Sequence, residues 1–111
     1  AATVELLERL AERHGRPVLV TEIGFPATPG AAVRPWEWPG EGDAVDLDEQ
    51  ARAYEATFRA LWGKPWLRGL YWWKWPSHGG TTRFDTTYSP VHKPAAQVLE
   101  RWYKEVPEGR K

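Results

Sequence analysis

Residues 16–25 read RPVLVTEIGF, and this stretch decides the fold. Such a short, β-branched and nearly continuous apolar run predicts a parallel strand that is covered on both faces. Because side chains alternate along a strand, one face would carry Val18, Val20 and Glu22, and the other Leu19, Thr21 and Ile23. A glycine and a long loop follow, so the glutamate would stand at the carboxyl end of the strand.

Helical patterns and a second apolar run surround this strand. Apolar residues recur at helical spacing over residues 3–14, 47–61 and 94–103, and residues 67–75 (LRGLYWWKW) form the second run. Asp46 and Glu49 have the spacing of a helix-capping box, and Pro94 suits the first turn of the last helix. The order α-β-α-β-α predicts an α/β fold with parallel strands joined by right-handed crossovers.

Two parallel strands would make an incomplete domain. Both edges of the pair would be open, and its faces would be only partly covered. The 111 residues also contain no methionine, even at position 1. These features indicate a processed, excised or truncated chain that belongs to a larger fold.

Composition argues against several classes of function. The 15 acidic and 15 basic residues give a net charge of zero, whereas a nucleic-acid binder normally has a basic face. No apolar run approaches the ~20 residues that span a bilayer, and the N-terminus reads as a charged helix rather than a signal peptide. There is no cysteine, and the three scattered histidines lack ligand spacing, so we expect no metal site.

Glu22 is the strongest candidate for a catalytic group. In barrels built from parallel strands, catalytic side chains lie at the carboxyl ends of the strands. The alternative is a strand-end glutamate that pairs with a neighbouring Arg or Lys. Position alone leaves both interpretations open.

The second candidate region is the aromatic run GLYWWKW at residues 69–75, which holds three of the eight tryptophans. A saccharide site needs flat apolar platforms beside hydrogen-bonding groups, and large aromatic side chains with a polar handle provide both. We expect Tyr71 and Trp72 to lie in the core. Trp75 and one of Trp73 or Lys74 would face a ligand, and the phase of the strand decides which.

Five segments together resemble glycoside hydrolase family 113. They are TEIGF at 21–25, PWEW at 35–38, DLDEQARAYEATFRALW at 46–62, PWLRGLYWWKW at 65–75 and YSPVHKPAAQVLERWY at 88–103. That family comprises retaining β-mannanase-type enzymes of a (β/α)8-barrel clan, with catalytic glutamates on strands four and seven. The resemblance implies that residues 1–106 are the C-terminal part of one TIM-barrel catalytic domain, about strands seven and eight with their helices. Residues 107–111 would be a charged tail.

The resemblance also implies roles for individual residues. Glu22 corresponds to the nucleophile on strand seven, and residues 73–75 correspond to the strand-eight segment at the sugar-binding mouth. Trp36 corresponds to a tryptophan of the loop after strand seven. His78, beside two glycines after the second strand, is a further candidate for contact with substrate. The substrate-binding candidates are thus Trp36, Trp73, Lys74, Trp75 and His78.

The acid/base glutamate of that family is not found in this sequence. It follows an Asn on strand four, and the chain contains no Asn. A retaining glycosidase needs two carboxyl groups about 5–5.5 Å apart. The loop carboxylates Glu37, Glu41, Asp43 and Asp85 would normally be solvated and are poor substitutes. We therefore expect a missing N-terminal barrel portion to supply this group, and the chain alone to be inactive.

The first hypothesis for function is a part of a retaining glycoside hydrolase that cleaves β-linked mannan or related β-glycans. Its partner would be an oligo- or polysaccharide, and the chemistry requires no cofactor. The second hypothesis is a non-catalytic carbohydrate-binding or interaction domain that uses the tryptophan cluster. A third is a fragment that dimerises to cover its strand edges. The sequence favours neither mannan over glucan nor endo over exo action.

Overall fold

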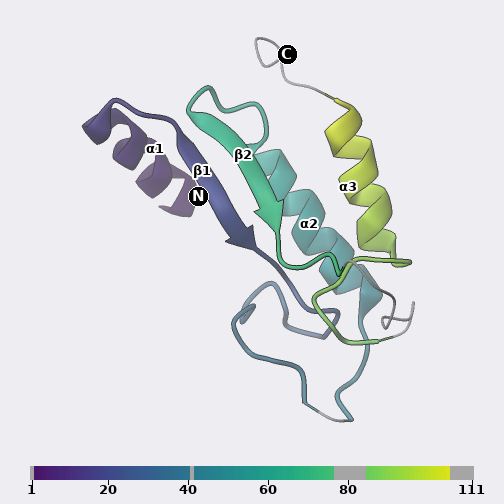
Figure 1. Ribbon diagram of the computed structural model, residues 1–111. Helices are drawn as coiled ribbons and strands as arrows, with labels where there is room; N and C mark the ends of the chain where they lie inside the picture. The colour runs from purple at the N-terminus through teal and green to yellow at the C-terminus, as the bar shows by residue number, and fades with distance from the viewer. Residues whose placement is uncertain (1, 41, 77–84, 106–111) are drawn as a thin grey trace.

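The computed structural model describes residues 2–40, 42–76 and 85–105 and contains three helices and two strands in this part of the chain. In chain order they are α1 (Ala2–His14), β1 (Val18–Ile23), α2 (Leu47–Leu61), β2 (Leu67–Trp72) and α3 (Pro94–Lys104) (Figure 1). The expected order α-β-α-β-α is confirmed. Among the described residues, none of the helices is long and apolar enough to cross a membrane.

The two strands form a parallel sheet with an irregular register. Val20 pairs with Leu70, whereas Ile23 pairs with Trp72, so β1 uses one residue more than β2 over this stretch. Such an extra residue disrupts the alternation of side chains. Thr21 and Glu22 are both exposed, while Val20 packs against the buried core. The uninterrupted alternation expected from the sequence is therefore wrong between Val20 and Ile23.

The hydrophobic core lies between the sheet and helices α2 and α3, which cover one face of it (Figure 1). Its buried members are Tyr54, Phe58, Leu61, Leu67, Leu70, Ala95 and Leu99. The expected place of Trp72 in the core is confirmed, because its ring stacks on that of Tyr54 at 3.9 Å between centroids. Tyr71 was expected there as well, but it is 61% exposed. It lies between two core-facing residues of β2, and successive side chains point to opposite faces.

The helix ends follow local sequence signals. The side chain of Asp46 accepts a hydrogen bond from the backbone N–H of Glu49 (2.9 Å), as expected for a capping residue. The reciprocal half of the capping box is absent, because the N–H of Asp46 donates to the carbonyl of Ala27 instead. Pro94 occupies the first turn of α3, as expected.

The other face of the sheet is open. Within the described ranges no helix covers this face, and the side chains of Leu19 and Tyr71 are 47% and 61% exposed. Helix α1 lies beside β1, at the edge away from β2 (Figure 1). The described residues thus form one wall of an α/β structure, with helices on one side and an uncovered sheet on the other.

Candidate active site at the carboxyl ends of the strands

Glu22 stands one residue before the end of β1, on the side of the long loops (Figure 1). Its side chain is exposed. Within the described residues it makes neither an ion pair nor a side-chain hydrogen bond. The alternative interpretation, a strand-end glutamate held by a nearby Arg or Lys, therefore has no support among these residues.

The end of β1 is fixed tightly against the segment that follows β2. The N–H of Trp73 donates to the carbonyl of Ile23 at 2.7 Å. A Cβ placed on Gly24 would lie 2.3 Å from the carbonyl oxygen of Trp73. Only glycine allows so close an approach of two backbones. The contact brings the chain just after Glu22 beside Trp73.

Strand β2 ends three residues earlier than expected from the sequence. It stops at Trp72, because β1 has no residue beyond Ile23 with which to pair. Trp73, Lys74 and Trp75 therefore lie in the connection after the strand, and the Trp73–Lys74 peptide bond is cis. Which of Trp73 and Lys74 would face a ligand remains a prediction. Both are exposed, and the Lys74 Nζ lies 5.6 Å from the centre of the Trp73 ring.

Three exposed tryptophans lie in the segments that follow β1 and β2. Trp73 is 38% exposed and Trp75 is 59% exposed. Trp36 in the loop after β1 is 70% exposed. His78, the remaining candidate from the sequence, lies outside the described residues. The structure thus places Trp73 next to the end of β1 and leaves Trp36 on a separate loop.

A contact between the two long loops was not expected from the sequence. Trp38, in the loop after β1, packs edge-on against Tyr88 of the segment before α3, with ring centres 5.1 Å apart. The hydroxyl of Tyr88 donates to the carbonyl of Pro35. Burial raises the pKa of the Tyr88 hydroxyl above its ordinary value. Trp38 is 69% exposed but is held in place from one side.

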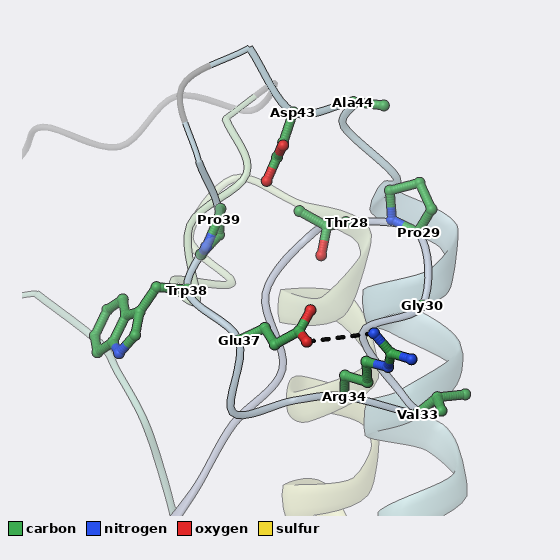
Figure 2. A pocket seen from close by; sticks show the side chains of 10 residues that line it. All are labelled: Thr28, Pro29, Gly30, Val33, Arg34, Glu37, Trp38, Pro39, Asp43 and Ala44. Carbon is green, nitrogen blue, oxygen red and sulfur yellow. Dashed lines mark hydrogen bonds and ion pairs between the residues drawn. The ribbon is translucent and has the colours of Figure 1, made fainter.

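A hollow of about 600 Å³ lies within the loop after β1 (Figure 2). Arg34 and Glu37 form an ion pair (3.4 Å) in its wall. Asp43 points into it and accepts a 2.6 Å hydrogen bond from the N–H of Gly40 (Figure 2). The ring of Trp38 points away from the hollow (Figure 2). Glu22 is not among the residues that line this hollow, so the hollow is not part of the candidate site.

The loop carboxylates have structural partners. Besides the partners of Glu37 and Asp43, Asp85 forms a 2.7 Å ion pair with Lys93, whose side chain is fully buried. Burial lowers the pKa of Lys93, and the hydrogen bond to Asp85 opposes this shift. The Lys93 ammonium also donates to the carbonyl of Thr87 at 3.1 Å. Asp85 thus fixes the segment before α3, and Glu41 lies outside the described residues.

Gln50 is the residue at this site that sequence reasoning missed. It is fully buried in the first turn of α2. Its Nε2 donates to the carbonyl of Phe25 at 3.0 Å. The signal was present in the sequence, because Gln50 lies three residues after Leu47 and four before Tyr54, on the apolar stripe of the helix. A polar side chain on such a stripe needs a partner.

These features define the class of protein. The chain is an α/β protein with parallel strands, helices on one side, and a free carboxylate with exposed aromatic side chains at the carboxyl ends of the strands. The model of Glycoside Hydrolase Family 113 matches residues 1–93. The chain belongs to this family, and the resemblance seen in the sequence is confirmed.

Solved structures of the same family share the fold. The GH113 β-mannanase AaManA from Alicyclobacillus acidocaldarius, in complex with ManMIm, is 36% identical, with a TM-score of 0.78 over 91% of this chain and 33% of its own. Two structures of a GH113 β-1,4-mannanase, one of them a complex, are 25% and 26% identical, both with a TM-score of 0.83 over 92% of this chain and 34% of theirs. No curated protein matches the sequence.

The chain spans about a third of the length of these structures. The expected fold, an α/β part of a (β/α)8 barrel with parallel strands, is confirmed by this match. The division into residues 1–106 and a tail at 107–111 remains a prediction.

Proposed function

We propose that this chain forms the nucleophile-bearing part of a retaining glycoside hydrolase that cleaves β-linked mannan or a related β-glycan. The observation that carries the proposal is the position of Glu22. Its carboxylate is exposed and unpaired among the described residues, and the end of its strand is fixed beside Trp73. A nucleophile needs a lone pair that no other group occupies.

The substrate class follows from the aromatic side chains and from the relatives. Trp73, Trp75 and Trp36 offer exposed rings on which the C–H faces of hexoses can stack. Lys74 and His78 would donate hydrogen bonds to sugar hydroxyls. The similar structures are named β-mannanases, which favours β-linked mannose units over other hexoses.

The mechanism is a double displacement. The Glu22 carboxylate attacks the anomeric carbon, and the bond from that carbon to the leaving oxygen breaks. A second carboxyl group, which this proposal places in the part of the barrel beyond this chain, gives its proton to the leaving oxygen. The same group then takes a proton from water as the water attacks the glycosyl ester, which releases Glu22. None of these steps needs a metal or a cofactor.

We assign the acid/base group to another strand because the candidate loop carboxylates among the described residues already have partners. Glu37, Asp43 and Asp85 each have a partner of opposite charge or a backbone N–H. We therefore expect the 111-residue chain alone to hydrolyse no glycan. A carbohydrate-binding module without catalysis remains the alternative, and it requires that Glu22 be dispensable.

Substitution of Glu22 in the full-length protein tests the proposal. Glu22→Ala and Glu22→Gln should reduce kcat on mannooligosaccharides by about 10⁴-fold or more, because they remove the covalent route. Binding of the same oligosaccharides, measured by calorimetry, should persist. Azide should restore turnover of an activated aryl mannoside to Glu22→Ala, and the product should be an azide with inverted configuration. Near-wild-type hydrolysis by either variant would refute the assignment.

A matched control is available on the same strand. Thr21 is the neighbouring exposed residue of the irregular stretch. Thr21→Val should fold and should retain most of the binding energy, and it should show no response to azide. A loss of kcat in Thr21→Val as large as that in Glu22→Gln would show that disturbance of the strand end, and not loss of a nucleophile, explains the effect.

A further inference from the structure

Gln50 connects three segments of the chain that are far apart in sequence. Its side chain is 0% exposed. The Nε2 group donates to the carbonyl of Phe25 at 3.0 Å and approaches the carbonyls of Thr87 and Tyr88 at 3.4 Å each. Phe25 follows the end of β1, and the other two residues precede α3. One amide group therefore joins the start of the loop after β1 to the segment that precedes α3.

The chemistry of these contacts requires an amide or another donor. Backbone carbonyls only accept hydrogen bonds, so the NH₂ of Gln50 must face them. The Oε1 atom is buried and has no hydrogen-bond partner among the described residues. Burial of such an atom is unfavourable, and an apolar side chain would suit the surrounding core better. The role of Nε2 explains why a polar residue occupies this position.

The contact with Phe25 acts on Glu22 through a short and constrained piece of backbone. The carbonyl of Ile23 accepts a hydrogen bond from the N–H of Trp73, and Gly24 is packed against the carbonyl of Trp73. Phe25 is held from the other side by Gln50. The three residues after Glu22 are thus fixed in succession by the segment that follows β2 and by α2.

We infer that Gln50 is a positioning residue, which holds the end of β1 so that the Glu22 carboxylate meets the anomeric carbon at the correct distance and angle. This inference rests on the proposed function, because it needs Glu22 to be the nucleophile. Gln50 itself is buried and would not touch the substrate. Its removal should therefore impair the chemical step more than the binding of sugar.

The first test is Gln50→Met in the full-length protein. Methionine has a similar volume and no donor. A displacement of about 1 Å at a reacting group can cost roughly 100-fold in rate, so we expect kcat to fall roughly 10- to 100-fold while KM for mannooligosaccharides changes less than about threefold. Gln97, the other glutamine of the chain, is exposed on α3, and Gln97→Met should match the wild type. An unchanged kcat in Gln50→Met would overturn the inference.

Titration of the active sites distinguishes a folding defect in Gln50→Met from a loss of positioning. An activated 2-deoxy-2-fluoro glycoside of the substrate sugar should trap the glycosyl ester, and peptide mass spectrometry locates the label. If Gln50→Met merely unfolds part of the population, kcat per labelled site will equal that of the wild type, which would contradict the inference. A label on a residue other than Glu22 would instead refute the proposed function.

The second test is the pH profile of Gln50→Glu. A neutral carboxylic acid can donate to the Phe25 carbonyl, whereas a carboxylate cannot. Burial raises the pKa of such a group above the ordinary value of about 4.3. The ratio of kcat in Gln50→Glu to that in the wild type should therefore rise as the pH falls from about 8 to 5, while the ratio for Gln50→Met stays constant. A constant ratio for Gln50→Glu would overturn the inference even if Gln50→Met failed to fold.

Discussion

The helix-facing side of the sheet and the carboxyl ends of its strands use the same residue type in opposite ways. Trp72, the last residue of β2, stacks on Tyr54 with an angle of 9° between the rings and also contacts Phe58. Trp75, three residues later, is 59% exposed and belongs to no aromatic cluster of the described residues. The end of the strand, and not the side chain, decides whether a tryptophan stabilises the fold or is available to a ligand.

The largest expected effects come from alanine substitutions at these two tryptophans, which test whether only Trp72 belongs to the core. Trp72→Ala should lower the free energy of unfolding by about 3–5 kcal/mol, because it removes a large side chain that packs in the core against Tyr54 and Phe58. Trp75→Ala should change it by about 0.5 kcal/mol or less. Urea denaturation of the full-length protein measures both. Equal losses of stability would show that Trp75 is part of the core of the complete barrel.

Catalysis should show the reverse order. In Trp75→Ala, kcat/KM on mannooligosaccharides should fall roughly 2- to 10-fold, as expected for the loss of an aromatic contact of about 0.5–1.5 kcal/mol. In Trp72→Ala, kcat per folded molecule should be close to that of the wild type. A kcat/KM for Trp75→Ala that equals the wild-type value would remove this residue from the sugar site.

Gly24 is the point at which the two regions meet, and its substitution has the next largest effect. A methyl group in Gly24→Ala would collide with the carbonyl of Trp73. The strand ends must then separate, at a cost of about 1–3 kcal/mol in stability. We expect kcat to fall at the same time, because Glu22 and Trp73 move apart. Fluorescence-detected unfolding and steady-state kinetics would follow the two changes.

Gly40→Ala is the matched control for this substitution. A Cβ at Gly40 would meet Asp43 at 3.6 Å, an ordinary contact, and the residue lies in the loop after β1. The equilibrium constant for unfolding and the kcat of Gly40→Ala should each stay within a factor of about two of the wild-type values. If Gly24→Ala and Gly40→Ala have the same stability and kcat, the backbone can relieve the close contact at Gly24 without loss of stability or activity.

The regular parts of the fold could be predicted from local patterns. The apolar spacing in α2, the Asp46 cap and Pro94 in α3 are short-range signals, and each is found in the structure. The parallel arrangement of the strands follows from their separation by a helix. The run RPVLVTEIGF alone was enough to predict that Glu22 lies near the end of a strand.

The errors and omissions come from interactions between distant residues. The extra residue of β1 near Glu22 and the early end of β2 depend on the register between the strands, which neither strand encodes alone. The contact of Trp38 with Tyr88 joins residues 50 positions apart. Gln50 interacts with carbonyl groups 25 to 38 positions away. Such contacts leave no periodic pattern in the local sequence. A glutamine within an apolar stripe does indicate a buried hydrogen bond.

Tyr54 gives the smallest and most specific effect, and it tests whether water is excluded from the helix-facing side of the sheet. Its hydroxyl is buried and has no hydrogen-bond partner among the described residues. Tyr54→Phe should therefore leave stability at pH 7 unchanged or raise it by up to about 1 kcal/mol, because an unsatisfied buried hydroxyl is removed. The exposed Tyr71 provides the control Tyr71→Phe, which should have no effect.

The same pair of variants should diverge at alkaline pH. Burial raises the pKa of Tyr54 well above the value of about 10 that applies in the unfolded chain. Above pH 10 the unfolded state loses the Tyr54 proton while the folded state keeps it, so the free energy of unfolding falls as the pH rises. Tyr54→Phe should lose less stability between pH 9 and about 11 than the wild type or Tyr71→Phe, as measured by urea denaturation. Parallel curves for all three proteins would mean that water reaches the hydroxyl of Tyr54, and the contrast between a dry helix-facing side and a solvated strand end would not hold at this position.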